Sequence, residues 1–256
     1  MSHGVNRSVF TDLNLNTLKT LLIVISLIFS LIGTDPTISV VEVPVFKLNF
    51  YLMGMQEVDQ EVTVRIGENI EYLNQEFEGR IVFELDQMVM DPNHAYIPDL
   101  HKAYIDRERN SVNELVDPIE IEGAINIYLF DTYSTDNGNS AMLGFTPVLS
   151  AQHSKYKTTS PSFDRLYISY PGLIDQSTIV HEMGHFLGLS HPWEMNDVSL
   201  DMMGLKNSEA EHNHMSYHPL VNHFTEQQLD RMQHFALNFR NYLISRIEYK
   251  AFVSAS

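Results

Sequence analysis

The sequence predicts an α+β fold in one domain, and three observations support this prediction. Segments with the two-residue alternation of strands and segments with helical spacing follow one another along the chain. Apolar residues make up 44% of the 256 residues, with 14 Phe and 12 Tyr, so a sizeable core can form. No internal repeat, low-complexity segment or long linker divides the chain after its N-terminal leader.

The first predicted elements are a strand, a helix and a second strand. Residues 45–53 alternate, and the apolar side chains on one face are Phe46, Leu48, Phe50 and Leu52. A helix follows, with helical spacing of Ile66, Ile70, Leu73 and Phe77, and Gly79 is expected as its C-cap. Residues 81–85 form an apolar run that predicts the second strand.

Further elements are expected towards the C-terminus. A helix is expected near residues 100–115, strands over 125–130 and 166–170, and a polar loop over 131–144, with Pro171-Gly172 ending the last strand. A final helix is predicted from Thr225, because Thr225 and Gln228 form a capping-box pattern and Phe224 with Leu229 a hydrophobic staple. The apolar stripe of this helix is expected to face the core and consists of Leu229, Met232, Phe235, Phe239 and Leu243.

Residues 181–191 contain a complete H-E-x-x-H-x-x-G-x-x-H pattern. His181 and His185 are four residues apart, so on a helix they share one face and can bind one metal ion. Glu182 can act as the general base toward a water molecule on that metal. Gly188 permits a sharp turn through positive φ, which would bring His191 round as the third ligand. Three protein ligands leave one position open, as in catalytic zinc sites.

The helix that carries this pattern is expected to start near Asp175 or Ser177, either of which can cap it. Its packing side toward the sheet is predicted to consist of Ile179, Val180, Met183 and Leu187. The alternative is an ordinary helix with unrelated histidines. A chance match to the five fixed positions is on the order of one in ten thousand for a chain of this size, which favours the metal site.

The pattern resembles the zinc helix of the metzincin peptidases. Asn213-His214-Met215-Ser216-Tyr217 is similar to the methionine turn of this clan, and the nearest resemblance, over residues 165–245, is to the pappalysin-like group. It implies a mixed β-sheet in an upper subdomain and an irregular lower subdomain that ends in a C-terminal helix. It also implies one Zn²⁺, Met215 beneath the metal, and Tyr217 as a donor to the oxyanion. Group members often have cysteines before this turn, and this chain has none.

Other polar residues near the turn have open roles. One of His212, His214, His218 and His223 can be a rival ligand or a substrate contact, but surface positions or places behind the ligands are expected, because His191 completes the set. Asp197 and Asp201 can bind Ca²⁺ or orient a ligand imidazole, and an exposed acidic loop is the alternative that we expect. Residues 143–150 or 166–170 are expected to form an edge strand that pairs with an extended substrate.

Residues 1–33 are predicted to be a signal peptide, and residues 34–256 the catalytic domain. Arg7 and Lys19 precede an apolar run from Leu21 to Ile32, which has signal-peptide length and is too short to span a bilayer. Gly33 is the best cleavage position, although no pair of small residues marks the site. An uncleaved membrane anchor is the alternative, and either outcome predicts a secreted or cell-envelope protein.

The amino-acid composition limits the classes of molecule that the protein is expected to bind and the kinds of site that it can contain. A net charge of −17 disfavours nucleic acids and anionic membrane surfaces, so membrane contact is expected only through an uncleaved leader. The absence of cysteine excludes disulfides, thiolate nucleophiles and Cys-based zinc sites. The sequence does not indicate an oligomeric state.

The expected function is zinc-dependent hydrolysis of peptide bonds in a peptide or protein substrate, with Glu182 as general base. One alternative is a zinc-holding binding or adhesion module without turnover. The intact Glu182 argues against it, because a zinc ion that serves only structure does not need this carboxylate. A second alternative is a protease effector with one narrow target, which the sequence does not separate from a general peptidase.

Overall fold

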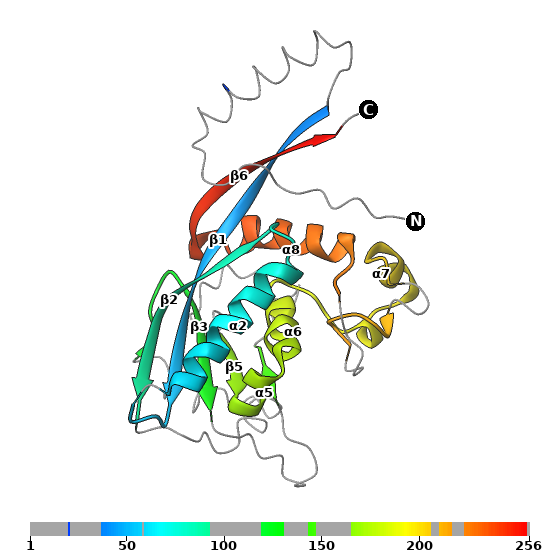
Figure 1. Ribbon diagram of the computed structural model, residues 1–256. Helices are drawn as coiled ribbons and strands as arrows, with labels where there is room; N and C mark the ends of the chain where they lie inside the picture. Colours follow the sequence, from blue (N-terminus) through cyan, green and yellow to red (C-terminus); the bar gives the residue numbers. More distant parts are fainter. Residues whose placement is uncertain are drawn as a thin grey trace.

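The computed structural model describes residues 20, 37–57, 59–92, 119–130, 143–146, 165–205, 210–216 and 223–254. Within these ranges the predicted α+β fold is confirmed (Figure 1). The expected leader over residues 1–33, Thr20 apart, and the expected helix near residues 100–115 lie outside the described residues. No helix of the described part is both long and apolar enough to cross a membrane.

The sheet is mixed, as expected. Its central order is β2-β1-β3-β5-β4, and β6 pairs with the first half of β1. The parallel neighbours are β2 (Val82–Asp91), β1 (Thr37–Met53), β3 (Ile125–Phe130) and β5 (Arg165–Ser169). The antiparallel strands are β4 (Gly144–Phe145), which lies beside β5, and β6 (Ile244–Ser254), which lies beside β1.

The helices of the described part are α2 (Gln60–Glu76), α5 (Tyr170–Ile174), α6 (Gln176–Phe186), α7 (Asp197–Met202) and α8 (Glu226–Phe239), with short 3₁₀ turns η4 (Pro192–Glu194) and η6 (Asn241–Leu243). Two predicted caps are confirmed. The Asp175 side chain accepts a hydrogen bond from the backbone N–H of Ser177 at the start of α6. Thr225 and Gln228 form the capping box of α8.

Several element boundaries differ from the predictions. Helix α2 ends at Glu76 with Phe77 as its C-cap, and Gly79 lies two residues further on in a left-handed conformation (φ +69°). Strand β5 ends at Ser169, one residue before the predicted end, and Pro171-Gly172 lies in the first turn of α5, which Ser169 caps. The last helix stops at Phe239, so Leu243 belongs to η6.

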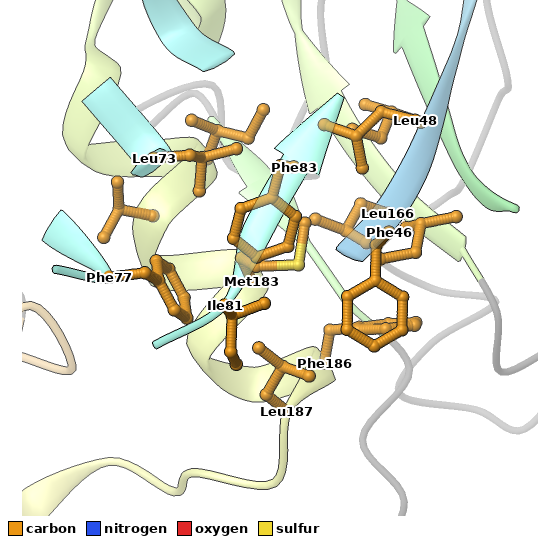
Figure 2. Close-up of a cluster of buried hydrophobic side chains, with 14 of the residues drawn as sticks. Phe46, Leu48, Leu73, Phe77, Ile81, Phe83, Leu166, Met183, Phe186 and Leu187 are labelled. Carbon is orange, nitrogen blue, oxygen red and sulfur yellow. The ribbon is translucent and has the colours of Figure 1, made fainter. Parts of the chain in front are cut away.

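One face of the sheet carries the main core, and α2 and α6 lie side by side over it (Figure 1). The alternation predicted for β1 is confirmed, because Phe46, Leu48, Phe50 and Leu52 are all buried in this core. The predicted packing residues of α6 are buried there too. Figure 2 shows Met183 and Phe186 among Phe46, Phe77 and Phe83, so the helix that bears the histidines is fixed to the sheet by aromatic and sulfur contacts.

The central strands are buried on the opposite face of the sheet as well. Tyr51, Tyr128, Tyr167 and Phe145 occupy paired positions on four neighbouring strands, and their rings stack with centroid distances of 4.6, 5.5 and 4.5 Å. Next to this row the buried Arg165 donates to the Glu120 carboxylate (Nε–Oε2 2.9 Å). The central strands β1, β3 and β5 are therefore buried on both faces around this row.

Candidate metal centre

Helix α6 places His181 and His185 one turn apart and Glu182 directly after His181, all in a largely buried position. The exposed fractions of these three residues are 9%, 6% and 6%. The helix ends in a Schellman turn, in which Gly188 N–H donates to His185 O (3.0 Å) and Leu189 N–H to Gly184 O (2.9 Å). Gly188 has φ +87°, and a methyl group there would lie 2.7 Å from the ring of Phe235, so both conformation and packing require glycine.

The Nδ1 atoms of both helix histidines are tied to backbone carbonyls. His181 Nδ1 lies 2.6 Å from the carbonyl oxygen of His214, and His185 Nδ1 lies 2.9 Å from that of Leu189. A carbonyl oxygen only accepts, so Nδ1 carries the proton in both rings, and the lone pair of each neutral ring is on Nε2. Histidines that bind metals through Nε2 have this arrangement.

His191 completes the group from outside the helix. It precedes η4, and its backbone N–H donates to Glu194 Oε2 (3.1 Å), while the same carboxylate lies 3.4 Å from His191 Nδ1. The ring of Trp193 stacks on the imidazole at 4.3 Å with an interplanar angle of 12°. Glu194 and Trp193 together fix the orientation of this third ring.

The three Nε2 atoms converge on one point. They lie 3.1 Å apart for His181 and His185, 3.0 Å for His185 and His191, and 3.3 Å for His181 and His191. Nitrogen ligands at about 2.0–2.1 Å from a tetrahedral zinc ion lie about 3.3–3.4 Å apart, close to these values. Lone pairs this close repel one another unless a cation lies between them. The three histidines are therefore positioned to bind a metal ion.

Burial keeps these imidazoles neutral. It lowers the pKa of His181 to about 3 and of His185 to about 4. Burial also lowers the pKa of His191, against the opposing effect of the Glu194 carboxylate. Neutral rings are the form that binds a metal, so protons compete weakly for this site.

Glu182 follows the first histidine and is enclosed by β4. A methyl group on Gly144 would lie 3.0 Å from Glu182 Cγ, and the hydroxyl of Thr146 donates to the backbone carbonyl of Glu182 (3.1 Å). Atom Oε2 of Glu182 is buried and has no hydrogen-bond partner among the described residues. Burial raises the pKa of this carboxyl to about 8, against a smaller opposing effect of the neighbouring Thr146 hydroxyl. Such a group can hold and release a proton near neutral pH.

Met215 lies beneath α6. It is fully buried, and a methyl group on Gly184 would lie 2.5 Å from its sulfur atom. Asn213 holds the turn: its Oδ1 accepts from the backbone N–H of Met215 (3.1 Å), and its amide forms a reciprocal pair with Gln228 at 2.7 and 3.0 Å. The turn is thereby joined to α8.

The remaining predicted residues do not join the histidine group. His214 turns its ring away toward Glu76, and His212 and His223 lie outside the group as well. Tyr217 and His218 lie outside the described residues. Asp201 is exposed on α7, and among the described residues the three histidines form the single cluster of three or more His, Asp or Glu placed to hold an ion.

Sequence reasoning identified the histidines but missed the residues that orient them. Three of them lie inside or directly after the pattern, so their place in the sequence could have identified them: Gly184, Trp193 and Glu194. Glu76, Thr146 and Gln228 come from distant elements and carry no local signal for this role. Of the two candidate edge strands, β4 is at the sheet edge and β5 is the strand inside it. Residues 147–150 of the expected edge lie outside the described residues.

Comparisons with known proteins give limited matches. No protein-family model matches the sequence, and no curated protein is significantly similar to it. Metalloproteinase-II from Bacteroides fragilis aligns with a TM-score of 0.47 and 15% identity, covering 75% of this chain and 53% of that chain. A chaperone–substrate complex aligns with a TM-score of 0.45 and 14% identity, covering 78% of this chain and 36% of that chain. This chain thus spans about half or less of these two structures.

Proposed function

We propose that this protein is a zinc-dependent endopeptidase of the metzincin type. The observation that carries the proposal is the convergence of three Nε2 lone pairs beside a buried carboxylate with an oxygen that has no partner. A site that only held a metal for stability would be closed by a fourth protein ligand. The described residues offer three histidine ligands and the Glu182 carboxylate beside them, which favours hydrolysis instead.

His181, His185 and His191 would hold the metal through Nε2. The zinc ion, when bound, supplies Lewis-acid chemistry that polarises a carbonyl and makes a water molecule more acidic. The chain itself contributes the orientation of the three rings, through the carbonyls of His214 and Leu189 and the carboxylate of Glu194. Fixed rings cost less reorganisation when a ligand enters.

Glu182 would move the proton in this reaction. Its unpartnered Oε2 would take a proton from the attacking water and later give it to the amine that leaves. Gly144 and Thr146 of the edge segment hold the carboxyl side chain and its backbone. Burial raises its affinity for the proton, which suits a group that must carry one between two steps.

The edge strand β4 suggests how a substrate would bind. It is two residues long in the described part and pairs with β5 on one side only within that part. An extended peptide can add to such an edge through backbone hydrogen bonds. Because Gly144 also contacts Glu182, a peptide on this edge would pass close to the proposed base.

The finer assignments extend the same proposal. We propose membership of the pappalysin-like group, export by way of the residue 1–33 leader, and a role for Tyr217 as a donor to the oxyanion. These rest on the sequence resemblance and on the length of the apolar run. N-terminal sequencing of exported protein tests the leader. A chain that starts at Met1 and stays on membranes would favour an anchor.

Metal analysis and cleavage of a peptide library test the central proposal. We expect about one zinc ion per chain, loss of cleavage on treatment with a chelator, and recovery with added zinc. Glu182→Gln should retain zinc and lose ~10²–10⁴-fold in turnover, because only the proton carrier is removed. A protein that binds zinc but cleaves nothing in a broad library would favour a binding module, and active protein without metal would refute the proposal.

A further inference from the structure

His214 connects a distant helix with a proposed metal ligand. Its backbone carbonyl accepts the Nδ1 proton of His181 (2.6 Å), and its own ring Nε2 lies 2.8 Å from the Glu76 carboxylate. Glu76 is the last residue of α2, and 138 positions separate it from His214 in sequence. One residue thus joins α2, the turn beneath the site and the first histidine of α6.

The ring of His214 has little room to move. It is 1% exposed, and it packs edge-on against Tyr72 with ring centroids 6.3 Å apart and in a tilted arrangement against Phe224 at 4.8 Å. The backbone of the same residue is also held, because its N–H donates to His223 O (3.1 Å). The two aromatic neighbours and the backbone hydrogen bond restrict the residue. The hydrogen bond to the carboxylate of Glu76 then sets the rotation of the imidazole.

The hydrogen bond between His214 and Glu76 has a defined donor and acceptor. The carboxylate only accepts, so His214 Nε2 carries the proton. If the carboxylate were absent, this buried N–H would have no described partner. The turn that contains His214 would then lower its free energy by rotating the ring toward another acceptor. Any such rotation displaces the carbonyl that holds His181.

We propose that Glu76 is a positioning residue for the metal site, acting through His214 to hold the Nε2 atom of His181 toward the other two histidines. The inference rests on the proposed function in one respect, namely that the three histidines bind zinc. Partners behind metal-bound histidines typically contribute 10- to 100-fold to affinity. Glu76 acts one residue further away, so we expect a change of about tenfold, at the lower end of that range.

The test compares Glu76→Ala and Glu76→Gln with wild type. Zinc affinity is measured by competition with a chromophoric chelator, and the visible spectrum of the cobalt-substituted protein reports the ligand geometry. Glu71→Ala is the matched control, because Glu71 is an exposed carboxylate on the same helix. Thermal unfolding of the metal-free proteins, measured in parallel, separates a general loss of stability from a change at the site.

We expect Glu76→Ala to weaken zinc binding about tenfold and to alter the cobalt spectrum, while Glu71→Ala changes neither. Glu76→Gln keeps an acceptor oxygen in place, so it should restore much of the affinity and remains informative if the alanine variant does not fold. Wild-type zinc affinity and spectrum in both Glu76 variants would overturn the inference, even if their melting temperatures fall. A wild-type protein that binds no zinc would overturn the proposed function and this inference together.

Discussion

The sulfur atom of Met215 lies directly against Gly184, between the two helix histidines. A methyl group on Gly184 would approach this sulfur to 2.5 Å and the ring of Phe224 to 3.4 Å. The glycine lies within α6, in its last turn, and inside a helix glycine is less favourable than alanine by up to about 1 kcal/mol. The close packing of Met215 beneath the site therefore requires a residue that the helix alone disfavours.

Gly184→Ala is expected to destabilise the protein. The added methyl group overpacks the contact with Met215 at a cost of about 1–3 kcal/mol, which exceeds the gain in helix propensity. Met215→Ala in the same chain should remove most of the cost that Gly184→Ala adds. Denaturant unfolding of the two single variants and the double variant gives the coupling free energy.

Gly67→Ala is the matched control for this substitution. Gly67 is also inside a helix, α2, but apart from its chain neighbours and its own helix backbone no described atom lies within 4 Å of the added methyl group. We expect Gly67→Ala to stabilise the protein by up to about 1 kcal/mol through propensity alone. Equal effects at positions 67 and 184 would show that Met215 simply moves aside.

Gly188→Ala tests the turn that brings His191 to the site. Alanine at φ +87° costs about 1–2 kcal/mol in conformation, and overlap with the Phe235 ring adds to that cost. The change also displaces Leu189, whose carbonyl holds His185. We expect a lower free energy of unfolding together with weaker zinc binding, measured by chelator competition.

Gly123 separates conformation from overlap in that experiment. It has φ +77°, and apart from its chain neighbours no described atom lies within 4 Å of an added methyl group. Gly123→Ala should cost only the conformational part, about 1–2 kcal/mol, and leave zinc affinity unchanged. If Gly188→Ala behaves like Gly123→Ala in both measurements, the packing against Phe235 has no role in the site.

The elements that were predicted well from the sequence are those whose determining residues lie within or directly beside the element. Strand β3 has the predicted bounds, and the caps of α6 and α8 are read from residues within three positions of the helix start. Strand β6 and the first half of β1 were missed, because they are stabilised by each other from opposite ends of the chain. Helix α7 was missed because Val198 and Met202 are exposed and give no buried stripe.

The residues of the site also fall into those that the sequence predicts and those that it does not. His181, His185 and His191 form an eleven-residue pattern whose helix spacing and glycine turn predict their convergence. The residues that orient them reach the site through tertiary contacts, as Glu76 does through His214 and Gln228 through Asn213. Spacing in sequence carries no information about such contacts, so only the folded chain reveals them.

The stability of the metal-free protein should depend on pH through the buried histidines. Burial lowers the pKa of His181 to about 3 and of His185 to about 4, whereas histidine in an unfolded chain titrates near ~6.5. Between these values the unfolded chain binds more protons than the folded chain. The contribution of these two histidines to the free energy of unfolding is therefore complete above about pH 6.5 and is lost as the pH is lowered toward 4, whereas the raised pKa of Glu182 acts in the opposite direction.

His185→Gln isolates this effect, because all other titrating groups remain. Each histidine that stays neutral contributes up to about 1.4 kcal/mol per pH unit to the slope. After chelator treatment, the unfolding free energy of the variant should fall less steeply between pH 6.5 and 4.5 than that of wild type. Parallel curves would mean that His185 takes up its proton equally easily in both states.

Gln228→Ala is expected to cause the largest loss of stability among polar substitutions in α8. The buried side chain pairs with the Asn213 amide and accepts from Thr225 N–H (3.0 Å), so alanine leaves several buried groups without partners. Each such group costs about 1–3 kcal/mol.

Two substitutions serve as controls. Thr225→Ala removes the cap hydroxyl of α8 and should cost about 1 kcal/mol, and Gln75→Ala, at an exposed position of α2, should cost little. Because Asn213 also holds the backbone of Met215, Gln228→Ala should weaken zinc binding as well. A variant that unfolds as Thr225→Ala does and binds zinc like wild type would show that the amide pair supports neither α8 nor the turn beneath the site.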